Sequence, residues 1–445
     1  ASGDTEDINR AVASAKKAYD SGVWSERNPR DKKAIMLRWA QLLNEHREEL
    51  ALLEAIDTGR PIADALSVDA PNSARVIQWY GETIDKTYDE IAPAPRNALA
   101  MVTREPLGVI GAVVPWNYPM MITSWKLGPA LAMGNSIVVK PAENSSLSAL
   151  KMAELAIAAG LPAGVFNVVP GLGSEAGQAL ARHMDVAKIA FTGSGPTGRK
   201  MMQYAAESNM KQVSLELGGK SPQVVLNDCT DLEAAASTIA WAIYYNAGQT
   251  CNAGSRIIVE KGVKEELFAH LHKFLESFVV GNQFDPTTQM AGLVSELQRD
   301  RVNAYLDLVG QDGEKLIFGG QKTSGKDLLI KPTLIDNVKP GSRLAQEEIF
   351  GPVLVAIDAK DEAEALQLAN GTEYGLAASV WTNNVARAHK FARKLRAGTV
   401  WVNTFDMLDV ITPFGGFGAS GNGRDKSLHA LDAYSALKTT WVDLN

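Results

Sequence analysis

The stretch Lys188-Ile-Ala-Phe-Thr-Gly-Ser-Gly-Pro-Thr-Gly-Arg199 joins an apolar, strand-like run to a glycine-rich turn and then to a helix-like segment. Gly193, Gly195 and Gly198 fit the pattern G-x-G-x-x-G, which lets backbone N–H groups approach a pyrophosphate at the start of a helix. A tight turn without a ligand explains the three glycines equally well. The acidic residue expected about 20 residues later is not clear, because Glu207 falls on the predicted helix.

The same alternation extends on both sides of this stretch. Short apolar runs alternate with helix-like segments from Leu107 to Asn227, and a second alternation continues from Asp231 to about Thr404. Apolar strands separated by helices predict a parallel sheet covered on both faces, so we expect an α/β fold with a doubly wound domain. The runs of the first alternation are Gly108–Val114, Ser136–Val139, Val165–Val169, Lys188–Phe191, Gln212–Leu217 and Pro222–Leu226.

The first ninety residues have a helical pattern, with segments at about Asp31–Ile56 and Asn72–Ile84. Residues 88–105 differ, because two prolines interrupt them and the part from Ala98 to Arg104 suits an extended ribbon. We expect this segment to lie away from the core.

Composition limits the class of protein. The 445 residues include 44 basic and 51 acidic side chains, and the net charge of −7 argues against nucleic acid or an anionic membrane as a partner. No segment has the length of a membrane-spanning helix. With only Cys229 and Cys251, we expect no disulfide framework and a cytoplasmic location. His270 and His272 face different sides of a predicted helix, so no metal site is expected.

Two residues are candidates for covalent and acid–base chemistry. Cys251 lies in the loop Asn246–Ser255, whose small polar residues could accommodate a nucleophilic thiolate, although the sequence alone modestly favours an inert thiol. Glu216 lies between Leu215 and Leu217 at the end of a strand-like run. It is either a solvent-facing strand residue or, if covered, a general base with a raised pKa.

Two further positions suit a nucleotide and an oxyanion. Lys140 and Glu143 follow the run Ser136–Val139, where they could hold a ribose or simply be a solvated pair. A carboxylate at 143 would repel a 2′-phosphate, which favours NAD over NADP. Asn117, in the segment Pro115–Pro119, could donate to an oxyanion, although an Asx turn beside proline is the competing explanation.

These motifs occur together in a characteristic order. The order is Pro115-Trp-Asn117, Lys140-Pro-Ala-Glu143, Phe191-Thr-Gly-Ser194, Leu215-Glu-Leu-Gly-Gly-Lys220, Gly248-Gln-Thr-Cys251, Glu347-Glu-Ile-Phe-Gly-Pro352 and Pro413-Phe-Gly-Gly416. By these motifs the chain resembles the NAD(P)-dependent aldehyde dehydrogenases from about Thr5 to its last residues. The segment Ser420–Leu431, together with Asp409, resembles the branch that oxidises γ-glutamyl-γ-aminobutyraldehyde and 4-guanidinobutyraldehyde.

The resemblance implies NAD-dependent oxidation of an aldehyde to a carboxylic acid. Cys251 would attack the aldehyde, Asn117 and the backbone N–H of Cys251 would hold the oxyanion, and Glu216 would activate water to hydrolyse the thioester. Lys140 is also implied as catalytic. The implied cofactor-binding residues are Trp116, Lys140, Glu143, Gly193, Ser194, Gly198, Leu217, Glu348 and Phe350.

The resemblance also implies a substrate site lined by Tyr118, Trp125 and Phe414. Asp409 would lie at its mouth and favour a cationic or amide-bearing tail, with a solvated loop acid as the competing explanation. The implied substrate is an amino-, amido- or guanidino-aldehyde from polyamine or arginine catabolism. A broad-specificity aliphatic or betaine aldehyde dehydrogenase remains an alternative.

Three parts are implied by the same resemblance. They are an NAD-binding domain (residues 1–87 and 106–218), a catalytic domain (219–420) and an oligomerisation ribbon (88–105 and 437–445) that would pair subunits in a homodimer or homotetramer. Family members usually begin earlier with extended segments, so a shortened form is expected. A non-enzymatic nucleotide-binding relative would lack Cys251, Glu216 or Asn117. A cysteine hydrolase would leave the 140–143 and 193–198 motifs unexplained.

Overall fold

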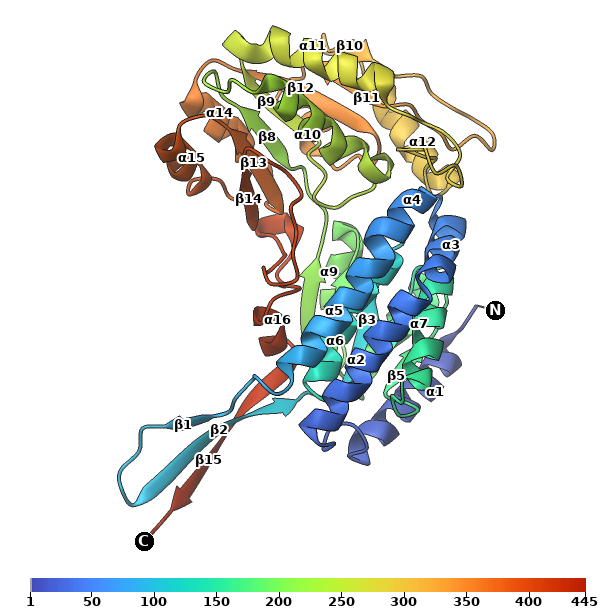
Figure 1. The fold of residues 1–445 in the computed structure, drawn as a ribbon, viewed down its shortest axis with the longest axis vertical. Helices are drawn as coiled ribbons and strands as arrows, with labels where there is room; N and C mark the ends of the chain where they lie inside the picture. Colours follow the sequence, from blue (N-terminus) through green and yellow to red (C-terminus); the bar gives the residue numbers. More distant parts are fainter. Residues whose placement is uncertain (1) are drawn as a thin grey trace.

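The computed structural model describes residues 2–445 as two α/β lobes and a narrow ribbon (Figure 1). The N-terminus lies beside the lower lobe of Figure 1, and the C-terminus lies at the tip of the ribbon. Each lobe is built around its own sheet, and a third sheet forms the ribbon. None of the helices within residues 2–445 is long and apolar enough to cross a membrane.

The first lobe contains a parallel five-stranded sheet in the order β5-β4-β3-β6-β7. All residues of β3 and β4 are buried, as the continuous apolar runs predict for a sheet covered on both faces. The strands are β3 (Val109–Val113), β4 (Ser136–Lys140), β5 (Phe166–Val168), β6 (Val186–Thr192) and β7 (Gln212–Glu216).

Helices cover both faces of this sheet. A large hydrophobic core lies between the sheet and α2, α5, α6 and α7, and a second core lies under α1, α8 and α9. The predicted doubly wound α/β fold is therefore confirmed. The helices are α1 (Thr5–Asp20), α2 (Pro29–Glu45), α3 (Arg47–Thr58), α4 (Ile62–Asp64), α5 (Ala70–Thr83), α6 (Pro119–Ala132), α7 (Leu147–Ala158), α8 (Gln178–Arg182) and α9 (Gly195–Ala206), with π-helical turns at Ala65–Asp69 and Gly173–Gly177.

The helical segment predicted over 31–56 is divided in two. The Asn28 side chain accepts from the backbone N–H of Arg30 and Pro29 occupies the first turn, so α2 begins there. The chain leaves helical geometry at His46 before α3 starts. Gly59 ends α3 with a left-handed φ of 75°, which glycine adopts without strain.

The second lobe contains a seven-stranded sheet in the order β10-β11-β12-β9-β8-β13-β14. Only β10 runs antiparallel to its neighbour. The strands are β8 (Pro222–Val225), β9 (Arg256–Glu260), β10 (Lys315–Phe318), β11 (Thr333–Asp336), β12 (Val353–Ala359), β13 (Ala377–Trp381) and β14 (Thr399–Val402). The helices are α10 (Leu232–Tyr244), α11 (Lys261–Ser277), α12 (Glu296–Leu306), α13 (Arg343–Gln346), α14 (Glu362–Ala369) and α15 (Val385–Ala392).

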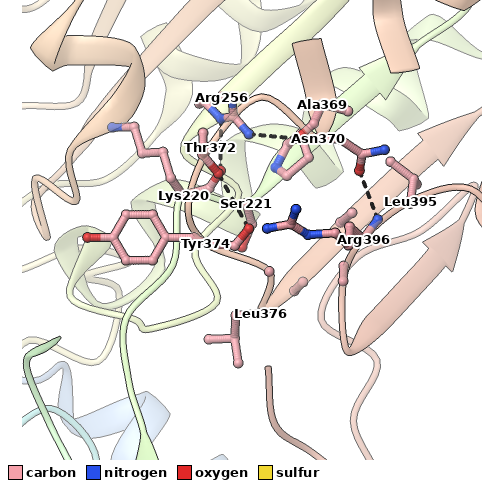
Figure 2. A pocket seen from close by; sticks show the side chains of 15 residues that line it. Lys220, Ser221, Arg256, Ala369, Asn370, Thr372, Tyr374, Leu376, Leu395 and Arg396 are labelled. Carbon is pink, nitrogen blue, oxygen red and sulfur yellow. Dashed lines mark hydrogen bonds between the residues drawn. The ribbon is translucent and has the colours of Figure 1, made fainter. Parts of the chain in front are cut away.

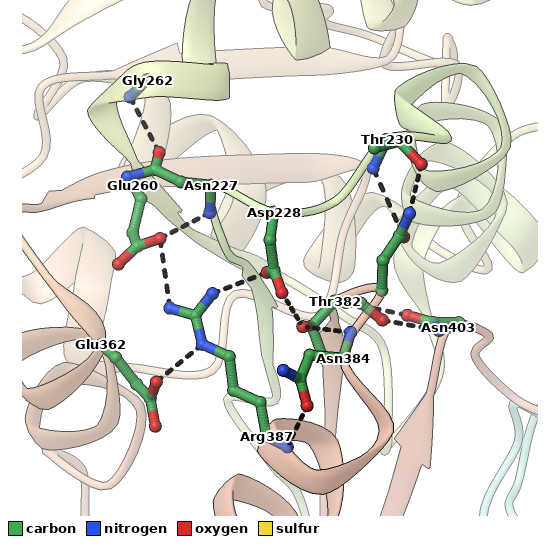
Figure 3. Close-up of polar contacts among 11 residues, drawn as sticks. Asn227, Asp228, Thr230, Glu260, Gly262, Glu362, Thr382, Asn384, Arg387 and Asn403 are labelled. Atoms are coloured by element: carbon green, nitrogen blue, oxygen red, sulfur yellow. Dashed lines mark hydrogen bonds and ion pairs between the residues drawn. The ribbon is translucent and has the colours of Figure 1, made fainter.

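The guanidinium of Arg387 links residues at the carboxyl ends of β8 and β9 (Figure 3). The guanidinium contacts Asp228 at 2.6 Å and Glu362 at 2.7 Å, and Glu260 lies 3.6 Å away. The Thr382 hydroxyl donates to Asp228 at 2.7 Å. Three carboxylates thus share one guanidinium, and the cluster links the strand ends to α14 and α15.

The ribbon expected from residues 88–105 and 437–445 has three strands. β2 (Ala98–Pro106) pairs antiparallel with both β1 (Glu90–Ala92) and β15 (Ser435–Asp443). β15 begins before the predicted residue 437, and its other edge has no partner strand within residues 2–445. The division into three functional domains and the role of the ribbon in assembly remain predictions.

Between β14 and β15 the chain returns to the first lobe. Val410, Phe414 and Tyr434 pack in the large core of that lobe, and α16 (His429–Asp432) lies against α6. The C-terminal segment therefore contributes to the hydrophobic core of the first lobe.

Candidate active site

The carboxyl ends of the first sheet bring several predicted site residues to one edge. In parallel α/β sheets, ligands bind at this edge, outside the carboxyl ends of the strands. Because β4, β3, β6 and β7 are neighbours in that order, the residues that follow them lie in a row. These residues are Glu143 after β4, Asn117 after β3, Gly193 after β6 and Glu216 at the end of β7.

The loop with Cys251 reaches this edge from the second lobe. It follows the short turn η3 (Tyr245–Gly248), in which Asn246 has a left-handed φ of 51°. The Asn246 side chain donates to the backbone oxygen of Asn117 at 3.1 Å, and the Asn117 side chain donates to the backbone oxygen of Gln249 at 2.9 Å. These two bonds cross between the lobes and hold Cys251 beside the strand ends.

Two cavities meet at Cys251. Thr192, Glu216 and Cys251 line both a smaller cavity of about 150 Å³ and a larger cavity of about 380 Å³. The smaller cavity is further lined by Pro115, Trp116, Asn117, Gly193, Ser194, Leu217, Gly218, Gln298, Arg301, Glu348 and Phe350. A group bound in either cavity can therefore reach the thiol and the carboxyl group of Glu216.

Glu216 is a buried carboxyl group without partners. Its side chain is almost fully covered, and neither carboxyl oxygen has a hydrogen-bond partner within residues 2–445. Burial raises the pKa of Glu216 well above its usual value, and the charge of Asp425 adds to this shift, whereas Lys126 and Arg424 oppose it. The covered environment that the sequence offered as one of two explanations is the observed one.

The surroundings of Cys251 favour the neutral thiol in the resting site. Burial raises the pKa of the thiol, and the charges of Glu348 and Glu216 act in the same direction, whereas the backbone N–H of Asn252 lowers it. Asn117 uses its amide nitrogen to donate to Gln249, and that nitrogen carries a second hydrogen. The geometry thus offers a donor for an oxyanion beside a thiol that must lose its proton to react.

Most of the predicted cofactor residues line the smaller cavity. Trp116 and Phe350 meet edge to face with 5.4 Å between their ring centroids. The Glu348 carboxylate accepts from the backbone N–H of Gly219 at 3.1 Å. Burial raises the pKa of Glu348 to about 7. A Cβ on Gly218 would lie 2.1 Å from this carboxylate, so glycine leaves the space that Glu348 occupies.

The remaining cofactor candidates lie outside both cavities. The Lys140 ammonium is buried, donates to the backbone oxygen of Gly171 at 2.8 Å and lies 3.7 Å from the Glu143 carboxylate. Its place therefore suits the expected nucleotide-binding role and not direct catalysis at Cys251. A Cβ on Gly198 would lie 2.8 Å from Leu217, so this glycine allows α9 to pack closely on the sheet.

These residues fit a dinucleotide. Ser194 immediately precedes α9, and the first N–H groups of a helix have no intrahelical partner, so they can bind phosphate oxygens. Space above Gly195 is open, because an added Cβ would meet only Arg199 at 3.6 Å. The exposed Glu143 carboxylate and the Lys140 ammonium beside it suit the hydroxyl groups of a ribose.

The larger cavity is mainly apolar and contains three of the four predicted substrate residues, Tyr118, Trp125 and Phe414. Asp409, the fourth, is not among its lining residues. The Asp409 carboxylate accepts from Arg75 at 2.7 Å, so its charge is already matched. The residue that does line the cavity is Asp406, three positions earlier in the same loop.

Sequence analysis missed a buried ion pair beside the site. The ammonium of Lys126 in α6 contacts the Asp425 carboxylate at 2.5 Å, and Asp425 lines the larger cavity. Thr192, which lines both cavities, was also not singled out, although it directly precedes the glycine-rich turn. No local pattern could have paired Lys126 with Asp425, because they lie 299 residues apart in the chain.

Arg256 holds the turn that follows Glu216 through hydrogen bonds to backbone oxygens (Figure 2). Its guanidinium donates to the backbone oxygens of Lys220 at 2.8 Å and Ala369 at 3.0 Å. The cavity drawn in Figure 2 has a volume of about 10 Å³, room for about one water molecule. Burial lowers the pKa of the Lys220 ammonium to about 7. This region supports the site without offering space for a substrate.

Comparisons with known proteins agree with this arrangement. The model of the aldehyde dehydrogenase family matches residues 1–440. The NADP/NAD-dependent aldehyde dehydrogenase PuuC of Escherichia coli is 48% identical over 444 residues, covering 100% of this chain and 89% of PuuC. The aminoacetaldehyde dehydrogenase of Pseudomonas aeruginosa is 49% identical over 441 residues, covering 99% of this chain and 88% of that protein.

A solved structure of an aldehyde dehydrogenase is also similar to this chain. The crystal structure of an indole-3-acetaldehyde dehydrogenase in complex with NAD+ superimposes with a TM-score of 0.98 at 52% identity, covering 100% of this chain and 90% of that one. At this level of identity the likeness extends beyond the fold to the sequence. The chain belongs to the aldehyde dehydrogenase family.

Proposed function

We propose that this chain oxidises an aldehyde to a carboxylic acid with NAD as the hydride acceptor. One observation carries the proposal: Cys251 and Glu216 form the wall shared by two cavities, one suited to a dinucleotide and one suited to an apolar aldehyde. A hydrolase that uses the same thiol would have no need of the smaller cavity. A structural relative would have no need of a thiol and an unpartnered carboxyl group at their junction.

The residues divide the chemistry in the following way. Sγ of Cys251 loses its proton and forms a bond to the aldehyde carbon, and Asn117 with the backbone N–H of Cys251 stabilises the oxyanion. NAD, when bound, supplies the acceptor for the hydride that leaves this carbon, so the acyl group remains on sulfur as a thioester. Glu216 then takes a proton from water, which attacks the thioester and breaks the carbon–sulfur bond.

The NAD assignment is supported by the residues around the strand ends. Trp116, Glu348 and Phe350 lie where a nicotinamide riboside would enter the smaller cavity. Lys140 and Glu143 lie at the end of β4 on the same sheet edge, and their charges suit the hydroxyl groups of a second ribose. The Glu143 carboxylate would repel a 2′-phosphate, which favours NAD over NADP.

For the substrate we infer an aldehyde whose tail carries an amino, amido or guanidino group. This is supported by the segment Ser420–Leu431 and by two similar proteins, one named for aminoacetaldehyde and one named PuuC. A neutral aromatic aldehyde is a second candidate, because Trp125, Trp241 and Phe405 all line the larger cavity and a similar structure is that of an indole-3-acetaldehyde dehydrogenase.

We also infer a homo-oligomer assembled through the ribbon. The outer edge of β15 has no partner within residues 2–445, and Leu437 and Trp441 on this strand are exposed. An unpaired strand edge with exposed apolar side chains favours pairing with a second chain. A cytoplasmic location is supported by the two cysteines, which are both free thiols.

The test is NADH formation by the purified protein with amino-, guanidino-, aliphatic and aromatic aldehydes, beside the variant Cys251→Ala. We expect NADH from the wild type and none from the variant, with NAD binding retained by both. Wild-type protein that is folded and forms no NADH with any of these aldehydes would overturn the proposal. Turnover of an ester without NAD as the only activity would favour the hydrolase.

A further inference from the structure

Two carboxylates that line the larger cavity, those of Asp406 and Asp425, have no part in the proposed reaction, and Asp425 is already paired with Lys126. Asp406 lies in the loop after β14 and lines this cavity. One oxygen of its carboxylate accepts from the side-chain amide of Asn252 at 2.6 Å. Within residues 2–445 the second oxygen accepts no hydrogen bond, and Asp406 forms no ion pair. The backbone of Asp406 has a left-handed φ of 57°, which is uncommon for a residue other than glycine.

Asp409, the neighbouring acid in the same loop, differs from Asp406 because it forms an ion pair. Asp409 is paired with Arg75 at 2.7 Å, and its carboxylate also accepts from the backbone N–H of Ile411 at 3.2 Å. Its side chain is about one-third exposed. A carboxylate that is already paired has little to gain from a ligand, whereas a partly covered carboxylate with a free oxygen gains a strong charge-assisted hydrogen bond.

The positive charge of Lys426 lies close to two aromatic rings that line the same cavity. The Lys426 ammonium lies 5.1 Å from the centroid of the Trp125 ring and 5.3 Å from that of Phe414. Lys426 is almost fully buried, and in the described part of the chain its ammonium donates no hydrogen bond and forms no ion pair. Burial lowers the pKa of Lys426 to about 8, so the ammonium remains charged at neutral pH.

The two charges act on each other without contact. Burial raises the pKa of Asp406, and the hydrogen bond from Asn252 and the charge of Lys426 oppose this rise. In an apolar cavity, an ionised group with an unused oxygen is costly until a donor reaches it. A positive group of a bound substrate would supply that donor and would at the same time be repelled by Lys426.

We propose that Asp406 is a specificity-determining residue whose free carboxylate oxygen receives a cationic hydrogen-bond donor, an ammonium or guanidinium, on the tail of the aldehyde. Lys426 repels the same positive group and so limits how strongly the site prefers a cationic aldehyde over a neutral one. The inference rests on the proposed aldehyde oxidation at Cys251 and replaces Asp409 as the acid that recognises the substrate. The competing explanation is that Asp406 only positions Asn252, the residue after the thiol.

The test compares 3-aminopropanal with butanal, two aldehydes of similar length of which only the first carries an ammonium. The measured quantity is the ratio of kcat/KM for the charged aldehyde to that for the neutral one. Asp406→Asn keeps an oxygen that can accept from Asn252 and removes the charge. We expect the ratio to fall about tenfold or more, because a hydrogen bond to a charged group is lost.

Two further variants make the pattern specific. Lys426→Met removes the opposing cation, so the ratio should rise, and Asp409→Asn should leave it at the wild-type value because Arg75 already matches that charge. An equal loss for both aldehydes in Asp406→Asn would overturn the inference and assign Asp406 to positioning Asn252. A fall of the ratio in Asp409→Asn alone would return recognition to Asp409. Wild-type protein inactive with both aldehydes would overturn the proposed function itself.

Discussion

Replacing Glu216 by glutamine separates the two halves of the proposed reaction. Glu216 is 3% exposed, and neither of its oxygens has a partner within residues 2–445. Burial raises its pKa well above the usual value, so the protonated acid is favoured in the resting site. Glutamine has the shape of that neutral acid. The variant should therefore fold normally and keep both cavities.

The expected magnitude follows from the role assigned to the side chain. A general base contributes about 10²- to 10⁴-fold to a rate, which corresponds to about 3–5 kcal/mol in the activation barrier. In Glu216→Gln this loss should fall on thioester hydrolysis, because attack by Cys251 and hydride transfer need no water. NADH should appear in a burst equal to the number of active sites, followed by a slow steady rate.

Stopped-flow absorbance of NADH measures both phases in one experiment. In the wild type, the steady rate should rise with pH, because the base must be deprotonated and its pKa is raised; in Glu216→Gln this rise should be absent. Glu207→Gln is the matched control, since Glu207 is an exposed acid that contacts Arg182 on the surface. A steady rate in Glu216→Gln within threefold of the wild type would refute the assignment of the base.

Three other substitutions test the architecture. Lys126→Met leaves the buried Asp425 carboxylate unpaired and should lower the free energy of unfolding by about 3–5 kcal/mol, measured by denaturant unfolding; a loss below about 1 kcal/mol would contradict this account. Gly198→Ala places a Cβ 2.8 Å from Leu217 and should cost about 1–3 kcal/mol and weaken NAD binding, measured by fluorescence titration. Trp441→Lys on the open edge of the ribbon should dissociate the proposed oligomer in sedimentation, and an unchanged assembly would exclude this edge as the interface.

The residues at the carboxyl ends of the first sheet were predictable, because the sequence pattern of each strand lies within a few neighbouring residues. The run Gln212–Leu217 predicted β7 to within one residue, although only Leu215 and Glu216 of this edge strand are buried. Strand ends then placed Asn117 and Glu216 on the same edge without knowledge of side-chain contacts. The split at His46 was missed because both helices have good helical patterns and the break depends on one residue.

Long-range relations were not predictable from the sequence. Asp406 and Asp409 lie in one loop with similar surroundings in the chain, and only the fold shows that Arg75, 334 residues away, pairs with Asp409. The same limit applies to Lys126 and Asp425. A sequence pattern assigns residues to strands, helices and loops, but the charge that a side chain meets depends on distant segments that the pattern does not connect.

The two lobes contribute different physical properties to the site. The first supplies Glu216 from the end of β7 and Asn117 from the bend that follows β3, and neither residue has a left-handed φ. The second supplies Cys251 and Glu348 from loops in which Asn246 and Phe350 have left-handed φ values of 51° and 61°.

Such conformations cost about 1–3 kcal/mol each and persist only where the surroundings enforce them. The reciprocal hydrogen bonds between the Asn246 side chain and the Asn117 backbone, and between the Asn117 side chain and the Gln249 backbone, cross from one lobe to the other. The same contacts that hold the strained loop therefore orient the oxyanion donor. Movement between the lobes would loosen the thiol loop and misplace Asn117 at the same time, so the position of the thiol relative to the edge of the first sheet depends on the packing between the lobes.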